Sequence, residues 1–153
     1  MLTGIALACA PERLEPERSC PEPLAAEAPR FEHACEHAAI GPFGSLDASR
    51  EAVELRNTHM LYTVTLRRTT NGYAGELRFT PRATGRYGIF MASDFPLLAR
   101  EDGDEVCLRG VAAQSPCEGL ARAQAYDLVE GRSVELAITD AATSTVSLVV
   151  ELL

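Results

Sequence analysis

The sequence predicts an all-β fold: an antiparallel β-sandwich, Ig-like or jelly-roll-like, of about seven or eight strands behind a disordered N-terminal tether. From residue 61 onward, apolar and polar residues alternate with the period of two that places neighbouring side chains on opposite faces of a strand. Turn residues recur about every 8 to 12 positions, as they do between the strands of sandwiches. The chain has 153 residues, of which 46% are hydrophobic and 24% charged, so it is large enough for one domain with a core. We expect this domain to span residues 31–153.

The chain begins with an apolar segment that ends in a cysteine. Cys9 is followed at once by sequence rich in proline and glutamate. The stretch Ile5-Ala6-Leu7-Ala8-Cys9 resembles the end of a bacterial lipoprotein signal peptide, in which small residues precede the cysteine that receives the lipid. This resemblance implies that residues 1–9 are a truncated signal, that Cys9 is the lipidation site, and that the protein is lipid-anchored in the periplasm or at the cell surface. The alternative is a short apolar N-terminus that packs against the domain.

Residues 10–30 are predicted to be a linker. Their proline-rich and glutamate-rich sequence has no sustained apolar periodicity, so it buries too little surface to offset the entropy lost on ordering. Such a tether would hold the domain away from a membrane, because prolines favour extended conformations. No segment approaches the ~18 apolar residues of a membrane-spanning helix, so a lipid on Cys9 is the only membrane contact we expect.

Five cysteines are an odd number for a protein that is expected to be exported. If Cys9 carries a lipid, four remain, and these can form two disulfides in an oxidising compartment. We favour pairing Cys35 with Cys117 and Cys20 with Cys107, because long loops constrain the unfolded chain more than short ones. Pairing of Cys107 with Cys117 across a hairpin remains open, since sequence does not choose among connectivities.

The first predicted strands form a hairpin. Residues 61–66 alternate, Asn71-Gly72 is a tight-turn signal, and residues 75–80 alternate again. Pro81 ends the second of these strands. Residues 45–56, which precede the hairpin, fit a helix almost as well as a broken strand.

Further short strands are expected along the rest of the chain. They are separated by turn signals, of which Asp102-Gly103-Asp104 and Glu130-Gly131 are examples. The predicted strands lie at residues 86–91, 97–99, 106–108, 125–128, 134–138 and 146–152.

Turn residues and strand aromatics of residues 60–152 suggest a family. They are Gly85-Arg86-Tyr87 with Phe90, Asp94-Phe95-Pro96-Leu97, and Tyr126-Asp127-Leu128 with Gly131. This pattern is similar to the small β-sandwich of bacterial pre-peptidase C-terminal domains, in which G-x-Y and D-P turns recur between strands. Here Phe95 separates the aspartate from the proline, and Val134 stands where the family has a second tyrosine. The resemblance implies a non-catalytic accessory module and carries over no active site.

All three histidines of the chain lie within residues 33–59 and form a candidate metal site. His33 and His37 are four residues apart, so on a helix they would share one face and reach the same ion. His59, at the start of the first predicted strand, would supply a third nitrogen, with Glu36 assisting. Neutral imidazole is a common ligand of zinc and copper, so zinc or copper is the expected cofactor of such a site.

The same residues have a second interpretation. Reduced Cys35 and Met60 would favour Cu(I), but an oxidised Cys35 is no ligand. Without a metal, His37 and His59 are polar residues hydrogen-bonded near the edge of the sandwich, and Glu36 is solvated. The two interpretations differ in whether residues 31–38 form a helix and whether His59 folds back onto it.

Several classes of function are disfavoured. The net charge of −8 repels phosphate backbones, so no nucleic-acid partner is expected. Neither a nucleophile elbow nor a glycine-rich phosphate loop occurs, and Ser93-Asp94 is typical of a turn. The acidic residues 101–105 lack the ligand spacing of a calcium loop and indicate a hairpin turn with solvated charges.

The sequence therefore favours a non-catalytic cell-envelope lipoprotein whose β-sandwich is a binding or interaction module. The alternative is a periplasmic zinc-binding or copper-binding protein that uses His37 and His59. An enzyme would be restricted to metal-assisted hydrolysis at the same histidines, and would need an acid or base beside the metal. The expected partners are an envelope protein or a metal ion.

Overall fold

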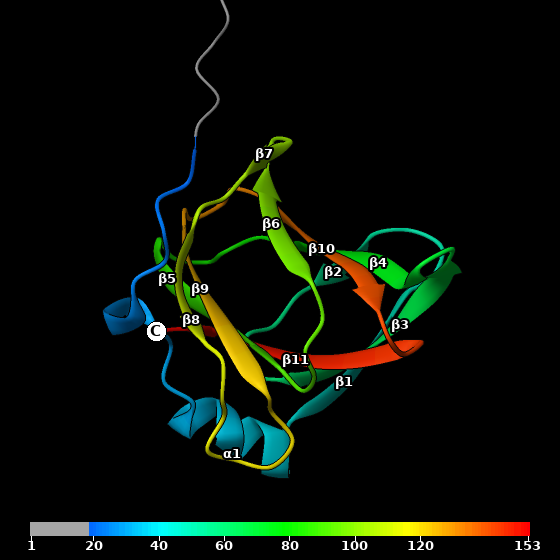
Figure 1. Cartoon of the computed structure of the whole chain (residues 1–153), viewed down its shortest axis with the longest axis horizontal. Helices are drawn as coiled ribbons and strands as arrows, with labels where there is room; N and C mark the ends of the chain where they lie inside the picture. The colour runs from blue at the N-terminus through cyan, green and yellow to red at the C-terminus, as the bar shows by residue number, and fades with distance from the viewer. Residues whose placement is uncertain (1–18) are drawn as a thin grey trace, which may run out of the picture.

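A computed structural model describes residues 19–153 of the chain, and these form the all-β fold that the sequence predicts (Figure 1). The described part contains eleven strands, one α-helix and one 3-10 helix. The helices are η1 (Ala25–Glu27) and α1 (Glu32–Ile40). The strands are β1 (Phe43–Ala48), β2 (Val53–Leu55), β3 (Leu61–Thr69), β4 (Gly72–Phe79), β5 (Gly85–Met91), β6 (Leu97–Glu101), β7 (Asp104–Glu105), β8 (Leu108–Ala112), β9 (Arg122–Leu128), β10 (Val134–Ala141) and β11 (Thr145–Leu152).

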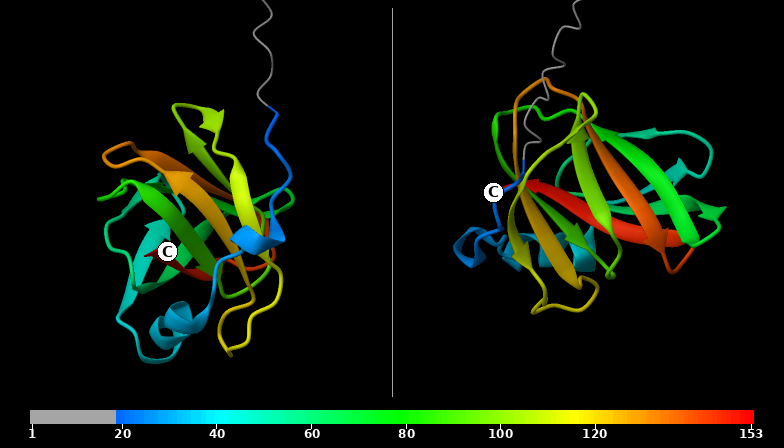
Figure 2. Two further views of the ribbon diagram at one scale, coloured as in Figure 1. Left: turned by 90° about the vertical axis from the view of Figure 1, so that its left-hand side faces the viewer. Right: turned by 45° about the horizontal axis from the view of Figure 1, so that its top comes forward.

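The strands form one curled sheet that turns back on itself (Figure 2). Their order is β7-β6-β10-β4-β3-β11-β5-β9-β8, with β1 added to β3 and β2 added to β4. Strand β3 belongs to both halves of the sheet, because residues 62–65 pair with β11 and residues 67–69 pair with β4. The inner faces of the two halves pack against one another in a common core, as in a sandwich.

The predicted hairpin is present in β3 and β4. Tyr62, Val64 and Leu66 are buried in the core, whereas Thr63 and Thr65 are exposed, as the alternation of side chains in a strand requires. The strands outnumber the predicted seven or eight by β1, β2 and β7, each of which pairs with a single neighbour at an edge of the sheet. The ambiguous segment of residues 45–56 contributes β1 and β2, which pair in parallel with their neighbours.

Strands β5 and β11 are buried on both faces. Ile89 and Met91 face the core, whereas Phe90 between them packs outward with Val149 of β11. A strand buried on both sides has a nearly continuous apolar sequence, which explains the runs of apolar residues in β5 and β11.

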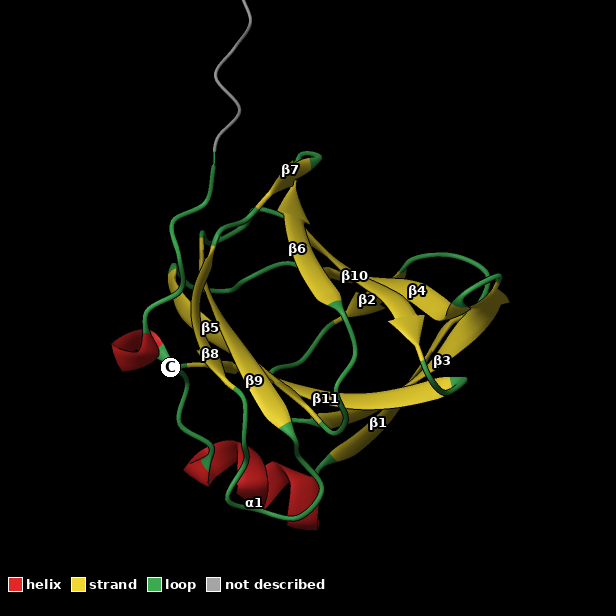
Figure 3. Ribbon diagram, viewed as in Figure 1, coloured by secondary structure: helices red, strands yellow, loops and turns green. Residues whose placement is uncertain are grey.

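Helix α1 covers the outer face of these two strands (Figure 3). Its Phe31 and Ala34 contact the outward-facing Phe90 and Val149, and the Phe31 and Phe90 rings meet edge to face at 5.3 Å. The helix ends at Gly41, whose φ of +82° is readily adopted only by glycine. The apolar residues of the core and those beneath the helix therefore form two separate clusters, one on each face of β5 and β11.

Residues 19–30, the second part of the predicted linker, are ordered against the domain. They run along the outside of the sheet, and their 3-10 turn η1 lies beside β8. Residues 10–18, like the predicted signal and Cys9, lie outside the described residues. The sequence missed this order because the contacts that hold the segment come from distant residues.

The contacts of this segment centre on Glu27. Its carboxylate lies 3.2 Å from the guanidinium of Arg109 and 3.5 Å from that of Arg86. The backbone N–H of Leu24 donates to the carbonyl of Arg109 at 2.9 Å. Gly110 permits this close approach, because a Cβ there would lie 2.3 Å from the backbone of Glu27.

Two disulfides tie the N-terminal part of the chain to the sheet. Cys20 is joined to Cys107, and Cys35 in α1 is joined to Cys117 in the loop before β9. These are the long-range pairs that loop-closure entropy favours. No helix among residues 19–153 is both long enough and apolar enough to cross a membrane.

Candidate metal centre

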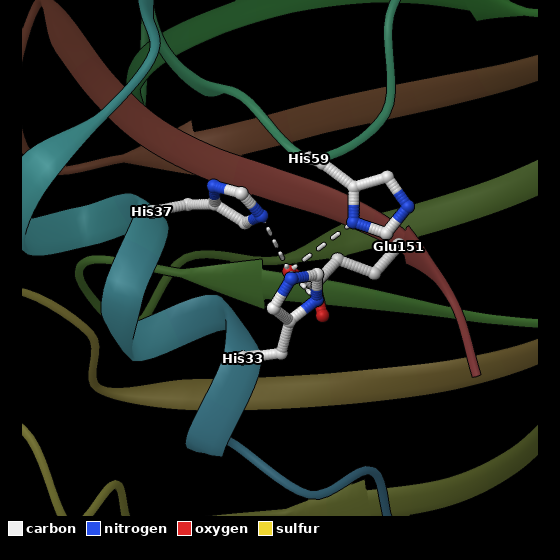
Figure 4. Close-up of side chains that lie close together, drawn as sticks. All are labelled: His33, His37, His59 and Glu151. Atoms are coloured by element: carbon white, nitrogen blue, oxygen red, sulfur yellow. Dashed lines mark ion pairs between the residues drawn. The ribbon is translucent and has the colours of Figure 1, made fainter.

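Three histidines and one glutamate converge beneath helix α1 (Figure 4). His33 and His37 come from α1, His59 comes from the loop before β3, and Glu151 comes from β11. One carboxylate oxygen, Oε1 of Glu151, lies 3.4 Å from His33 Nδ1, 3.6 Å from His37 Nε2 and 3.8 Å from His59 Nδ1. Elements from both ends of the domain therefore build one group of four side chains.

The α-helix brings His33 and His37 together. Residues four apart lie on the same face of a helix, and the two rings are 4.6 Å apart. Cys35, between them, is held to Cys117, while Phe31 and Ala34 are buried against the sheet. These anchors fix the rotation of α1, so the face with both histidines is turned towards Glu151.

A backbone contact places His59. Its N–H donates a hydrogen bond of 2.9 Å to the carbonyl of Val150, the residue next to Glu151. His59 has a positive φ of 57°, a conformation that is uncommon for residues other than glycine. Positive-φ residues cluster at functional sites, where the surrounding structure holds them in place. The imidazole is thus fixed beside the carboxylate by the main chain.

Glu151 is the buried member of the group. Its side chain is 3% exposed, although it follows the apolar run Leu148-Val149-Val150 and precedes Leu152. It projects from the same outer face of the sheet as Val149, and its partner across the strand pair is Gly88. A buried carboxylate is costly unless a cation or hydrogen bonds compensate it.

A carbonyl group fixes the tautomer of His37. Its Nδ1 lies 3.1 Å from the oxygen of Gly41. A carbonyl only accepts, so Nδ1 carries the proton and donates it to Gly41. In the neutral ring, Nε2 then has a free lone pair, and this is the atom that faces Glu151. A backbone acceptor on the opposite ring nitrogen is a common feature of metal-binding histidines.

The atoms that face one another lack hydrogen-bond partners. His37 Nε2, His59 Nδ1 and Glu151 Oε1 are buried and form no hydrogen bond within residues 19–153. The four candidate ligand atoms all lie within 4.8 Å of one another. Tetrahedral ligands at zinc–nitrogen distances of about 2.0–2.1 Å are roughly 3.3–3.4 Å apart. The three nitrogen–oxygen separations are at or just above that spacing, and the remaining separations are at most 4.8 Å, so modest side-chain movement would close the group around a cation.

The structure brings together the three predicted histidines but places the other predicted ligands elsewhere. Glu36 is exposed and does not join the group, because its side chain leaves the helix about 100° away from that of His37. Cys35 is in a disulfide and offers no thiolate. Met60 packs against the core. Glu151 takes the position of the carboxylate ligand.

Sequence reasoning missed Glu151 because it lies at the other end of the chain. The signal in the sequence is a single charged residue in the apolar strand β11. Glu151 lies two residues after Val149, on the same outer face of the strand, and Val149 is fully buried. A charged residue at a buried strand position needs a partner, and that rule would have singled it out.

The donor set limits the chemistry of the group. Imidazole suits zinc, copper, iron and nickel, and carboxylate oxygen is a harder ligand that disfavours Cu(I). Cys35 offers no thiolate because it is in a disulfide, and Met60 packs against the core. The arrangement therefore matches a divalent transition-metal ion.

No protein-family model matches the chain, and no curated protein is significantly similar to it in sequence. The function of the chain is therefore inferred from the geometry and chemistry of its described residues.

Proposed function

We propose that the protein binds one divalent transition-metal ion, zinc in the first place, through His33, His37, His59 and Glu151. The observation that supports this most is the meeting of three buried, unpartnered polar atoms around one point. Unpaired buried polar groups lower stability, so apolar residues at these positions would give a more stable contact between the helix and the sheet.

The ligand count favours storage, transport or structural use of the metal over catalysis. Three imidazoles and one carboxylate complete the four-coordinate shell that zinc prefers, whereas catalytic zinc sites leave one position open. His33 is the most exposed of the four, at 57%, and His37 is 14% exposed. The ion therefore enters and leaves past His33, the ligand most free to swing towards solvent. Cu(II) is the second candidate, since it accepts the same donors.

We also propose that this binding takes place in the cell envelope, where the protein acts as a lipid-anchored, non-catalytic module. Two disulfides support an oxidising compartment, because such bonds persist outside the cytosol. Mass spectrometry tests the anchor on protein from a bacterial host, expressed with a basic segment added before residue 1 to complete the truncated signal. We expect a lipid-sized mass increase that is absent from Cys9→Ser. Equal masses, after allowance for the substitution, would contradict it.

Elemental analysis and calorimetry test the metal site. The full chain is produced without a histidine tag in an oxidising compartment, dialysed, and titrated with zinc. We expect one equivalent per chain, lost or bound at least a hundredfold more weakly in His37→Ala and Glu151→Gln, because each removes one of four ligands.

Glu36→Gln is the matched control for Glu151→Gln. It makes the same chemical change to an exposed carboxylate on the helix that carries two of the histidines, so zinc binding should be unchanged. A wild-type protein that neither retains nor binds zinc or copper would overturn the proposal. Equal effects of the two glutamine variants would also overturn it.

A further inference from the structure

A second candidate site lies next to His59, in a pocket of about 280 Å³. His59 contributes to its wall, together with the loop that precedes it and the loop between β4 and β5. None of the other metal-centre residues lines this pocket. It is therefore a separate cavity that shares one side chain with the metal centre.

One side of the pocket is apolar. Phe79 and Tyr87 are buried and pack edge to face at 5.4 Å, and Leu152 is 43% exposed although it is a large apolar residue. The hydroxyl of Tyr87 already donates to the carbonyl of Ala83 at 2.9 Å. The inner surface thus offers apolar contact to a ligand rather than further hydrogen bonds.

Two arginines make the mouth of the pocket positive. Arg56 and Arg82 both line it, and Nη2 of Arg82 donates to the backbone carbonyl of Arg56 at 3.4 Å, which holds the two loops together. Within residues 19–153, neither guanidinium lies within ion-pair distance of a carboxylate, whereas five other arginines do: Arg86, Arg100, Arg109, Arg122 and Arg132. In a chain with a net charge of −8, this is an uncompensated cationic position.

We propose that this pocket binds a small amphipathic carboxylate, with its head at Arg56 and Arg82 and its apolar body against Phe79, Tyr87 and Leu152. Arginine binds carboxylate with two directed, charge-assisted hydrogen bonds, so a pair of arginines selects an anion over a neutral molecule. The volume lies just below the roughly 300 Å³ at which drug-sized pockets begin, which suits a ligand of about ten non-hydrogen atoms. The proposal does not depend on occupancy of the metal centre.

Octanoate, which has a carboxylate and an apolar chain of the required size, is the probe. It is titrated into the full chain by calorimetry in excess EDTA, so that a failure of the metal proposal leaves the result unaffected. We expect saturable binding at one site. 1-Octanol keeps the apolar body without the charge and should bind at least tenfold more weakly, since a charged hydrogen bond contributes about that factor or more.

Two pairs of substitutions decide whether the arginines form the site. Arg56→Gln with Arg82→Gln should weaken octanoate binding tenfold or more. Arg67→Gln with Arg68→Gln removes the same charge from exposed positions of β3, away from the pocket, and should change affinity less than twofold. All four arginines are exposed, and circular dichroism of both double variants checks that they are folded, because Arg82→Gln also removes the hydrogen bond to the Arg56 carbonyl.

A third variant tests the apolar part of the pocket. Ala83→Phe keeps the carbonyl that Tyr87 uses and fills the cavity, so it should abolish binding. The proposal is overturned if the wild type shows no saturable binding, if the two arginine pairs act equally, or if Ala83→Phe binds as the wild type does.

Discussion

At the scale of single residues, Glu151 is the most unusual position in the molecule. It lies on the outer face of β11, at a buried position that suits an apolar side chain. It is 3% exposed, and its Oε1 forms no hydrogen bond among the described residues. Folding therefore removes a carboxylate from water, and among the described residues its ion-pair partners are three imidazoles. Such a residue is expected to lower the stability of the metal-free protein in return for binding.

Glu151→Val is predicted to stabilise the metal-free protein. Valine suits the strand and its buried neighbours, so the free energy of unfolding in excess chelator should rise by about 1–3 kcal/mol. Urea unfolding followed by circular dichroism measures the change. The variant should also lose all stabilisation by zinc. A decrease in stability would instead identify Glu151 as a structural partner of the histidines.

The histidines could be grouped from the sequence, whereas Glu151 stands out only as a single charge in an apolar strand and could not be assigned to them. His33 and His37 are related by helix periodicity, a local property of the chain. Glu151 reaches them only through the pairing of β11 with β3 and β5, and pairing partners are not encoded locally. Glu36 looked equally suitable in sequence, but the helix turns it away.

At the scale of elements, helix α1 carries two of the four proposed metal ligands and is attached to the sheet by one disulfide and a small apolar cluster. Whether residues 31–38 form a helix was open from the sequence, and the structure has a helix at Glu32–Ile40. The strands with clear alternation, such as β3 and β4, were also predicted, whereas β1 and β2 were ambiguous because they are short and only partly buried. Local pattern identifies an element only when one face is consistently buried.

The two disulfides allow a matched experiment on α1. Their sequence separations are 87 and 82 residues, so removal of either should destabilise the fold by a similar amount, about 4.5 kcal/mol by loop entropy. Only Cys35–Cys117 holds the helix with the histidines. We predict that the paired serine substitutions Cys35→Ser and Cys117→Ser weaken zinc binding about tenfold or more, while Cys20→Ser with Cys107→Ser leaves it within threefold.

Calorimetric zinc titration of both double variants, under conditions where each is folded by circular dichroism, measures this difference. Equal zinc affinities would show that the apolar contacts of Phe31 and Ala34 suffice to position α1.

At the scale of the whole molecule, the bend in β3 decides the architecture. The first part of β3 pairs with β11 and the last part with β4, so one strand joins the two halves of the curled sheet. The alternation of apolar and polar residues predicted the all-β class, because this alternation shows which face of each strand is buried. The order of strands, the parallel additions β1 and β2, and the packing of residues 19–30 depend on long-range contacts and could not be derived from local sequence.

This architecture also places the metal centre and the arginine-rimmed pocket on either side of one imidazole. His59 directs Nδ1 towards Glu151, while Nε2 points away from the carboxylate (Figure 4). A metal on Nδ1 takes the lone pair of that nitrogen, so the proton of the neutral ring must sit on Nε2. Metal binding therefore makes His59 a fixed hydrogen-bond donor and places a positive charge beside a pocket that His59 helps to line.

We predict that zinc and octanoate bind cooperatively. Octanoate affinity in the zinc-loaded protein should exceed that in EDTA by about fivefold, and octanoate should raise zinc affinity by the same factor, because coupling between two sites is reciprocal. Calorimetric titrations of each ligand, with and without the other, measure both factors. The Arg56→Gln, Arg82→Gln variant should keep its zinc affinity and lose the coupling. Equal octanoate affinities with and without zinc would mean that the two sites share His59 but are not energetically coupled.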